Sequence, residues 1–229
     1  MSDNAELNRL FSLMFQSHPW HGVPVGVNAP EIVNAFIEIV PNDAIKYELD
    51  KSSGRLRIDR PQRFSSLCPM PYGFLPQTYC GESIAEFCRE KTGMPIVKGD
   101  GDPLDICVLT EKTMAHGDFF LAAKPIGGLR MVDKLEADDK IIAVLYDDAA
   151  FGHLNDISEV PVAVVERLQH YFLTYKQLPS ETERRVYITH VYGRDEAFEV
   201  IRRSGLDYRE TYGEPEKRIA ELKRLFSVN

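Results

Sequence analysis

Short segments in which apolar and polar residues alternate dominate the first part of the chain. Residues 45–50 and 55–60 follow this period of two, and the turn 51–54 joins them into a hairpin. Residues 32–40 are also strand-like, with Glu38 in an apolar context. Residues 67–74 are interrupted by prolines and predict irregular structure. Further strand-like segments occupy residues 104–110, 118–126, 129–132, 140–146 and 186–192. The pattern predicts a sheet or barrel of many short strands.

Helical periodicity occurs at both ends of the chain and in one internal segment. It predicts an amphipathic arm over residues 3–16 and further helices over 83–91, 160–178, 195–204 and 215–226. Gly205 is expected to end one of the last two helices, and Pro215 to begin the other. Most helices follow the strands, so the layout predicts a mainly β (α+β) fold, a small antiparallel barrel with external helices. No repeat or linker appears, so we expect residues 1–229 to form a single domain.

Composition and charge exclude several classes of protein. Acidic residues outnumber basic ones by 35 to 27, and the net charge of −8 opposes a general nucleic-acid binder. The sequence contains no run of eighteen apolar residues, so it predicts no membrane span. The first residues do not resemble a signal peptide, so we expect a cytoplasmic protein. The four cysteines form no CxxC pair, which argues against a zinc ribbon and favours buried, reduced thiols.

Three carboxylates lie within six residues, on a Gly-Pro turn before a strand-like segment. Asp100, Asp102 and Asp105 would raise one another's pKa unless a cation neutralised them, and Mg²⁺ or Mn²⁺ suits such oxygen ligands. A solvated acidic turn is the simplest alternative. A calcium loop of the EF-hand type is a poorer one, because Leu104 stands where that loop needs an oxygen donor, and Asp105 where it needs glycine.

Other acids and bases occur at strand-like spacing elsewhere in the chain. The acids are Glu38, Glu48, Asp133 and Asp138; the cations are Lys46, Arg60, Lys140 and Lys176; the phenols are Tyr72 and Tyr175. Seven carboxylates facing one cavity would require several divalent ions, and four cations beside them suit a dense anion that arrives with its metals. Phosphate fits, because arginine binds it with a fork of two donors and lysine with a point charge.

These residues resemble a known family. The run from Asp100 to Asp105 fits the D-x-D-P-x-D motif of the soluble inorganic pyrophosphatases of family I. The other segments occur in the family's order: Glu38-Ile39, Ile45 to Glu48, Gly54 to Arg60, Tyr72-Gly73, Asp133 with Asp138 and Lys140, and Tyr175-Lys176. The resemblance covers about residues 30–205. It implies an OB-like five-stranded barrel with external helices and hydrolysis of pyrophosphate to two orthophosphates.

The resemblance also implies a role for each acid. Asp100, Asp105 and Asp138 would bind the tightest activating metal, and Asp105 would bridge to a second one. The water between those two metals would be the nucleophile, and Asp102 its general base. Metals that arrive with substrate, or a further one, would be held by Asp133, Glu48 and Glu38. The implied cofactor is Mg²⁺, in several ions, with Mn²⁺ as a substitute.

The cations and phenols would bind the substrate. The resemblance assigns the two phosphates of pyrophosphate to Lys46, Arg60, Tyr72, Lys140, Tyr175 and Lys176. Water would attack directly, without a phosphoenzyme. Members of the family form oligomers of several sizes, so we expect a homo-oligomer of unstated size.

The chain departs from the family in three places. Cys68 stands where well-known bacterial members carry tyrosine, so a phenol that would brace the general-base water is missing. The segment 79–99 is longer than in compact bacterial members, so we expect it to be an insertion. Three roles are open for it: a lid, a subunit contact or a surface excursion. The N-terminal arm and the last helix extend beyond the shared core.

Two other functions compete with this interpretation. A hydrolase of another diphosphate should carry a Nudix pattern or a GxxxxGK[ST] phosphate loop, and the chain has neither. An OB-type module that binds single strands should have a basic groove with exposed aromatic residues, and the excess of acids opposes that.

Overall fold

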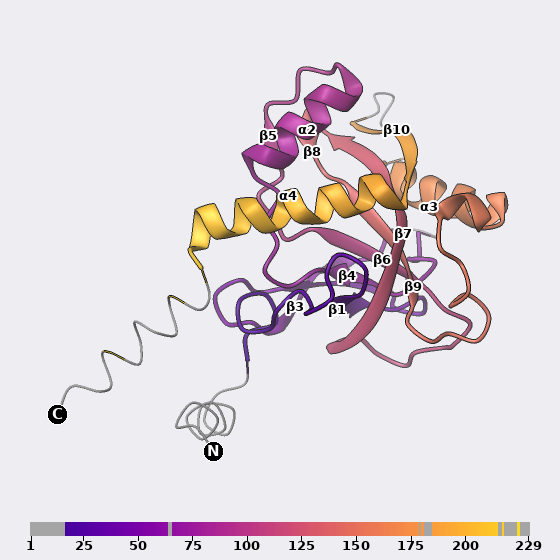
Figure 1. The fold of residues 1–229 in the computed structure, drawn as a ribbon. Coiled ribbons are helices and arrows are strands. Elements are labelled where there is room, and N and C mark those ends of the chain that lie inside the picture. The colour runs from indigo at the N-terminus through magenta and orange to yellow at the C-terminus, as the bar shows by residue number, and fades with distance from the viewer. Residues whose placement is uncertain are drawn as a thin grey trace.

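Five strands close into a barrel in the computed structural model, which describes residues 17–63, 66–178, 180, 185–214, 217 and 224 (Figure 1). In spatial order they are β1 (Val33–Ile39), β4 (Tyr72–Phe74), β6 (Asp105–Leu109), β9 (Lys140–Leu145) and β7 (Phe119–Asp133). The ring closes because β7 also pairs with β1. This confirms the expected OB-like barrel; β6 and β9 run parallel, and the other four pairings are antiparallel.

Strand β7 is fifteen residues long and extends beyond the barrel. There it pairs with β10 (Val186–Gly193) and β8 (Glu136–Ala137), and β8 continues to β5 (Lys98–Gly99). The prediction of two strands, 118–126 and 129–132, was wrong. The register shifts between Pro125 and Gly127, so a local irregularity absorbs the proline without ending the strand. The ring of Tyr192 lies against Gly128, where a Cβ would be 2.4 Å from it.

The short strand β4 corrects the expectation that residues 67–74 are irregular. Its three residues complete the barrel between β1 and β6. The neighbouring backbones approach so closely that a Cβ on Gly73 would lie 1.8 Å from the carbonyl oxygen of Phe36. The prolines before the strand conceal this pairing, because they remove the alternating pattern.

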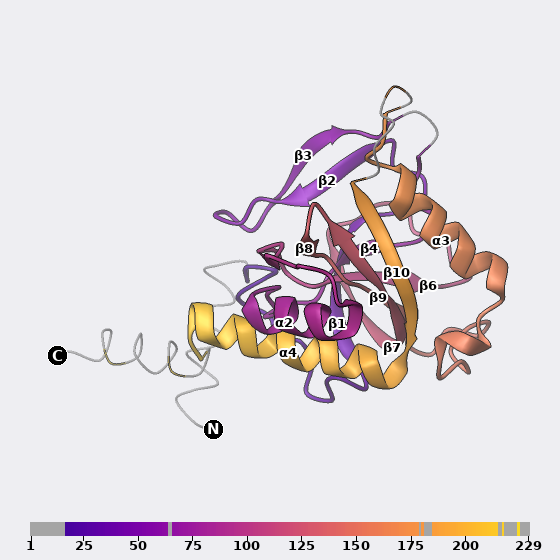
Figure 2. The same cartoon turned by 90° about the horizontal axis from the view of Figure 1, so that it is seen from above.

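The predicted hairpin is confirmed as β2 (Ile45–Leu49) paired with β3 (Leu56–Pro61). It forms a separate two-stranded sheet that stands beside the barrel (Figure 2). The hairpin therefore provides a second wall facing the strand ends of the barrel.

Helices cover the outside of the barrel. They are α2 (Glu82–Thr92), α3 (Val162–Thr174), α4 (Arg194–Tyr212) and the 3₁₀ turn η1 (Ile157–Glu159). One apolar cluster joins the barrel to α2 and α4, and a second joins it to α3. The four cysteines are buried and free, as expected. None of the helices in the described part of the chain is long and apolar enough to cross a membrane.

Helix α4 continues through Gly205, where the sequence predicted its end. The turn beyond this glycine buries Asp207 and Tyr208, so tertiary packing outweighs the unfavourable helix propensity of glycine. The predicted arm 3–16 lies outside the described residues, as does almost all of the predicted helix 215–226.

Candidate active site

A cleft of about 230 Å³ lies between the hairpin and the end of the barrel. Its walls come from β1, β2, β4, the acidic turn before β6, the end of β7, the start of β9 and the residues after α3. Twelve of the thirteen predicted site residues line it: Glu38, Lys46, Glu48, Tyr72, Asp100, Asp102, Asp105, Asp133, Asp138, Lys140, Tyr175 and Lys176. Residues from seven segments of the chain therefore converge on one hollow.

Arg60 is the predicted site residue that the cleft does not include. It lines a neighbouring cleft of about 370 Å³, which shares Lys46, Asp133 and Lys176 with the first. The guanidinium carbon of Arg60 lies 5.8 Å from the centre of the Tyr175 ring. Among the described residues its buried Nη1 atom has no hydrogen-bond partner, so this donor is available to an anion.

The acidic turn is folded so that its carboxylates converge. Gly101 has φ +77°, a conformation that glycine adopts without strain, and the backbone N–H of Asp102 donates to Asp100 Oδ1 at 3.0 Å. Burial raises the pKa of Asp100 well above its usual value, and the charge of Asp138 raises it further. A cation placed among these oxygens would relieve that unfavourable environment.

Lys140 lies at the centre of the acidic group. Its Nζ contacts Asp105 Oδ2 and Asp138 Oδ1, and its side chain is 2% exposed. Burial by itself would lower the pKa of Lys140, but these two carboxylates outweigh burial and raise it. Strands β6 and β9 pair Asp105 with Lys140 in parallel register, which places the two side chains on the same face.

Oxygen donors of this kind suit Mg²⁺, which takes carboxylates and retains water. Asp100, Asp105 and Asp138 are donors of this kind that line the cleft, and the raised pKa of Asp100 indicates that its negative charge is poorly compensated. No three Asp, Glu, His or Cys side chains within the described part of the chain already enclose an ion-sized space. The ammonium group of Lys140 draws Asp105 and Asp138 onto itself, so these carboxylates would have to turn towards a metal.

Glu38 extends from β1 into the same cleft and is 8% exposed. Its Oε1 accepts a hydrogen bond from the backbone N–H of Leu49, at 2.7 Å, which ties the barrel to the hairpin. Burial raises the pKa of Glu38 to about 8; the Leu49 bond opposes this rise and the charge of Asp105 adds to it. The group is therefore poised to gain or lose a proton near neutral pH.

The basic side chains are held by acids near the edge of the cleft. Lys46 Nζ lies 2.9 Å from Asp59 Oδ2, and Lys176 Nζ lies 2.6 Å from Asp133 Oδ2. Burial raises the pKa of Tyr175, although Lys176 opposes that effect. The phenol therefore stays protonated at neutral pH and can donate a hydrogen bond.

Sequence reasoning missed two charged residues of the hairpin. Lys51 Nζ contacts Asp102 Oδ1, and Asp59 pairs with Lys46. Lys51 lies in the turn between the two strands and Asp59 lies in β3 opposite a register shift, and in both places a charged side chain is indistinguishable from an ordinary solvent-exposed one. Only the packing of the hairpin against the barrel reveals them.

Cys68, the departure noted in the sequence, does not line the cleft. It is buried, and its Sγ donates to the carbonyl oxygen of Met70 at 3.2 Å. Burial raises the pKa of this thiol to about 12, so it stays protonated. The side chain serves as a small core residue here.

Comparison with known proteins gives a consistent result. The profile of the inorganic pyrophosphatase family matches residues 35–209. An inorganic pyrophosphatase of Chlamydia trachomatis serovar L2 is 50% identical over 196 residues, which cover 84% of this chain and 94% of that protein. A soluble inorganic pyrophosphatase of Oryza sativa subsp. indica is 38% identical over 178 residues, covering 76% and 74% of the two chains. The crystal structure of inorganic pyrophosphatase from Thermus thermophilus superimposes with a TM-score of 0.69 at 31% identity, covering 83% and 99%.

Proposed function

The chain belongs to the inorganic pyrophosphatase family, and from this premise we propose that it catalyses the Mg²⁺-dependent hydrolysis of pyrophosphate to two orthophosphates. The observation that carries the proposal is the convergence of carboxylates, lysines and phenols from distant segments on one cleft. Such a mixture suits a small, densely charged anion that is bound together with divalent cations.

The acidic side of the cleft would hold the metal. Asp100, Asp105 and Asp138 would bind the tightest ion, and Asp133, Glu48 and Glu38 would bind further ions. When bound, Mg²⁺ or its substitute Mn²⁺ would neutralise the crowded oxygens and make a water molecule more acidic. Ions of this kind are held by oxygen atoms, and the cleft offers carboxylate oxygens in excess.

The basic side would hold the two phosphates. Lys46, Lys140 and Lys176 line the cleft and would donate to the phosphates, Arg60 would donate from the neighbouring cleft, and Tyr72 and Tyr175 would add uncharged donors. Water attacks one phosphorus, the bridging P–O bond breaks, and the second phosphate leaves with that electron pair. Asp102, at the rim and close to the metal-binding acids, accepts the proton of the attacking water.

Release of phosphate from pyrophosphate, with and without Mg²⁺ and with ATP as a parallel substrate, tests the proposal. Rapid, Mg²⁺-dependent release from pyrophosphate alone is the expected result. Release from ATP at a comparable rate would indicate a broader diphosphate hydrolase, and no release at any metal concentration would refute the enzymatic assignment. We also propose a homo-oligomer in the cytoplasm, which gel filtration and cell fractionation would test.

Asp102→Asn tests the assignment of the base. The amide keeps the shape of the side chain but cannot accept the proton at neutral pH, so the variant should fold normally and lose about 10²-fold or more in turnover. Normal turnover in this variant would show that another group takes the proton. Asp195→Asn is the matched control, because Asp195 is 98% exposed at the start of α4.

A further inference from the structure

The residues between β8 and β9 carry charge on both sides of one backbone segment. Asp138 and Lys140 face the cleft, where their side chains contact each other. Asp139, between them, points the opposite way and is 1% exposed. The same short segment therefore presents one pair of charges to the cleft and buries a third behind it.

The buried carboxylate of Asp139 is paired with Arg130. Arg130 Nε lies 3.2 Å from Asp139 Oδ2, and both side chains are 1% exposed. The same oxygen accepts a hydrogen bond from the phenol of Tyr192 at 3.1 Å. An ion pair this deeply buried holds its partners closely, because separating them would leave a charge without water or counter-ion.

Strand register places Arg130 at the centre of this support. The residue before it, Leu129, pairs with Lys140 across β7 and β9. The residue after it, Met131, accepts a hydrogen bond from the backbone N–H of Asp138 at 3.0 Å. The backbone of β7 thus binds the segment on both sides, and the Arg130 side chain binds its middle.

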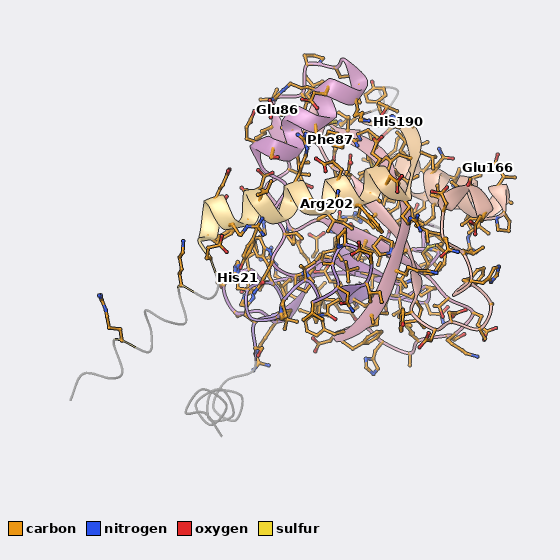
Figure 3. The ribbon with its side chains drawn as sticks, viewed as in Figure 1. His21, Glu86, Phe87, Glu166, His190 and Arg202 are labelled. Carbon is orange, nitrogen blue, oxygen red and sulfur yellow. The ribbon has the colours of Figure 1, made fainter. Side chains whose placement is uncertain are left out.

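Helix α2 completes the support through one aromatic ring. The guanidinium carbon of Arg130 lies 4.8 Å from the centre of the Phe87 ring, and that of Arg203 lies 4.5 Å from it. Such contacts are attractive and are strongest where water is excluded. Figure 3 shows Phe87 on α2, above α4. The Arg130 guanidinium also contacts Glu196 of α4, at 2.8 Å.

We propose that Asp139, Arg130 and Phe87 are positioning residues that hold the backbone so that Asp138 and Lys140 face the metal and the phosphate. The inference rests on the proposed role of Asp138 as a metal ligand. It assigns a purpose to the inserted segment 79–99: its helix supports the metal-binding segment from behind. Groups behind metal ligands commonly tune affinity in this way, and their loss weakens binding about 10–100-fold.

Calorimetric titration of the substrate-free protein with Mg²⁺ tests this assignment directly. Asp139→Asn keeps an acceptor for the Tyr192 phenol but loses the charge, and Phe87→Leu keeps an apolar side chain but loses the ring. Each variant should bind Mg²⁺ about tenfold more weakly, and the Mg²⁺ concentration for half-maximal activity should rise by the same factor. Asp195→Asn is the matched control, because this carboxylate is 98% exposed at the start of α4, so its Mg²⁺ affinity should match that of the parent.

A purely structural role would give a different result. Lower melting temperatures with parental Mg²⁺ affinity in both variants would overturn the inference, and parental affinity in Phe87→Leu alone would overturn the part assigned to α2. Arg130→Lys, which keeps the charge but not the planar contact with the ring, provides a milder probe should Asp139→Asn fold poorly, and it too should weaken Mg²⁺ binding. Asp138→Asn tests the premise separately: unchanged Mg²⁺ binding in that variant would reject the proposed ligand itself.

Discussion

The buried carboxyl of Glu38 should make the stability of the metal-free protein depend on pH. This side chain is 8% exposed and accepts a hydrogen bond from the Leu49 backbone N–H at 2.7 Å. Burial raises its pKa to about 8 from an ordinary value of 4.5. Glu38→Gln is the informative perturbation, because the amide oxygen can keep the Leu49 bond while the ionisation is lost.

The sign follows from proton linkage. Between pH 4.5 and 8 the folded state retains a proton on Glu38 that the unfolded state has released, so rising pH favours unfolding. This loss of folding stability is absent below pH 4.5 and complete above pH 8. Within this range each pH unit lowers the free energy of unfolding by about 1.4 kcal/mol, so the parent loses about 3 kcal/mol between pH 5.5 and 8.5. The Gln variant carries no such penalty.

Urea denaturation in EDTA across this pH range measures the effect. The stability of Glu38→Gln relative to the parent should increase by about 3 kcal/mol as pH rises from 5.5 to 8.5. For a chain of this size this corresponds to about 6–12 °C in melting temperature. Glu38→Met controls for the hydrogen bond: relative to Glu38→Gln it should lose about 1–3 kcal/mol at every pH. Parallel pH curves for the parent and Glu38→Gln would refute the reasoning.

Three further predictions follow from local geometry. Asp207 of α4 accepts three backbone N–H bonds at the start of α2, so Asp207→Ala should destabilise the protein by about 2–4 kcal/mol in urea denaturation and speed hydrogen exchange at those amides, whereas Asp195→Ala should do neither. A Cβ on Gly73 would meet the Phe36 carbonyl oxygen, so Gly73→Ala should lose at least about 3 kcal/mol, against about 1 kcal/mol for Gly93→Ala, where no atom lies within 4 Å. Ca²⁺ is larger than Mg²⁺ and takes more ligands, so it should inhibit phosphate release; undiminished turnover with Ca²⁺ alone would contradict the proposed metal site.

The parts of the fold that follow local patterns could be predicted from the sequence. The hairpin, α2 with its end at Gly93, and the strand before Pro41 all carry a clear period or a turn residue. Strand β4 and the continuity of β7 could not be predicted, because proline and glycine remove the pattern while neighbouring strands supply the hydrogen bonds. The extension of α4 through Gly205 likewise depends on contacts made by residues distant in sequence.

The same division applies to the candidate site. The acids of the turn could be recognised because their spacing is unusual and because it matches a family motif. Lys51 and the pair formed by Arg130 and Asp139 could not, since the partner of each lies about nine to fifty positions away in the sequence and no local pattern links the two. Their roles depend on strand register and on the docking of the hairpin, which a single sequence does not specify.

The distribution of charge between the two clefts suggests how a metal-bearing anion would orient. Of the described residues, those lining the first cleft include eight carboxyl groups and four lysines, a formal charge of −4. Those lining the neighbouring cleft include six cations and two acids, a formal charge of +4. Lys46, Asp133 and Lys176 belong to both and mark the boundary between them. A bare anion would be repelled by the first cleft, whereas an anion that carries divalent ions could place its metals on the acidic side and its outer phosphate on the basic side. The opposing fields thus favour one orientation, and they explain why acids and bases are both required so close together.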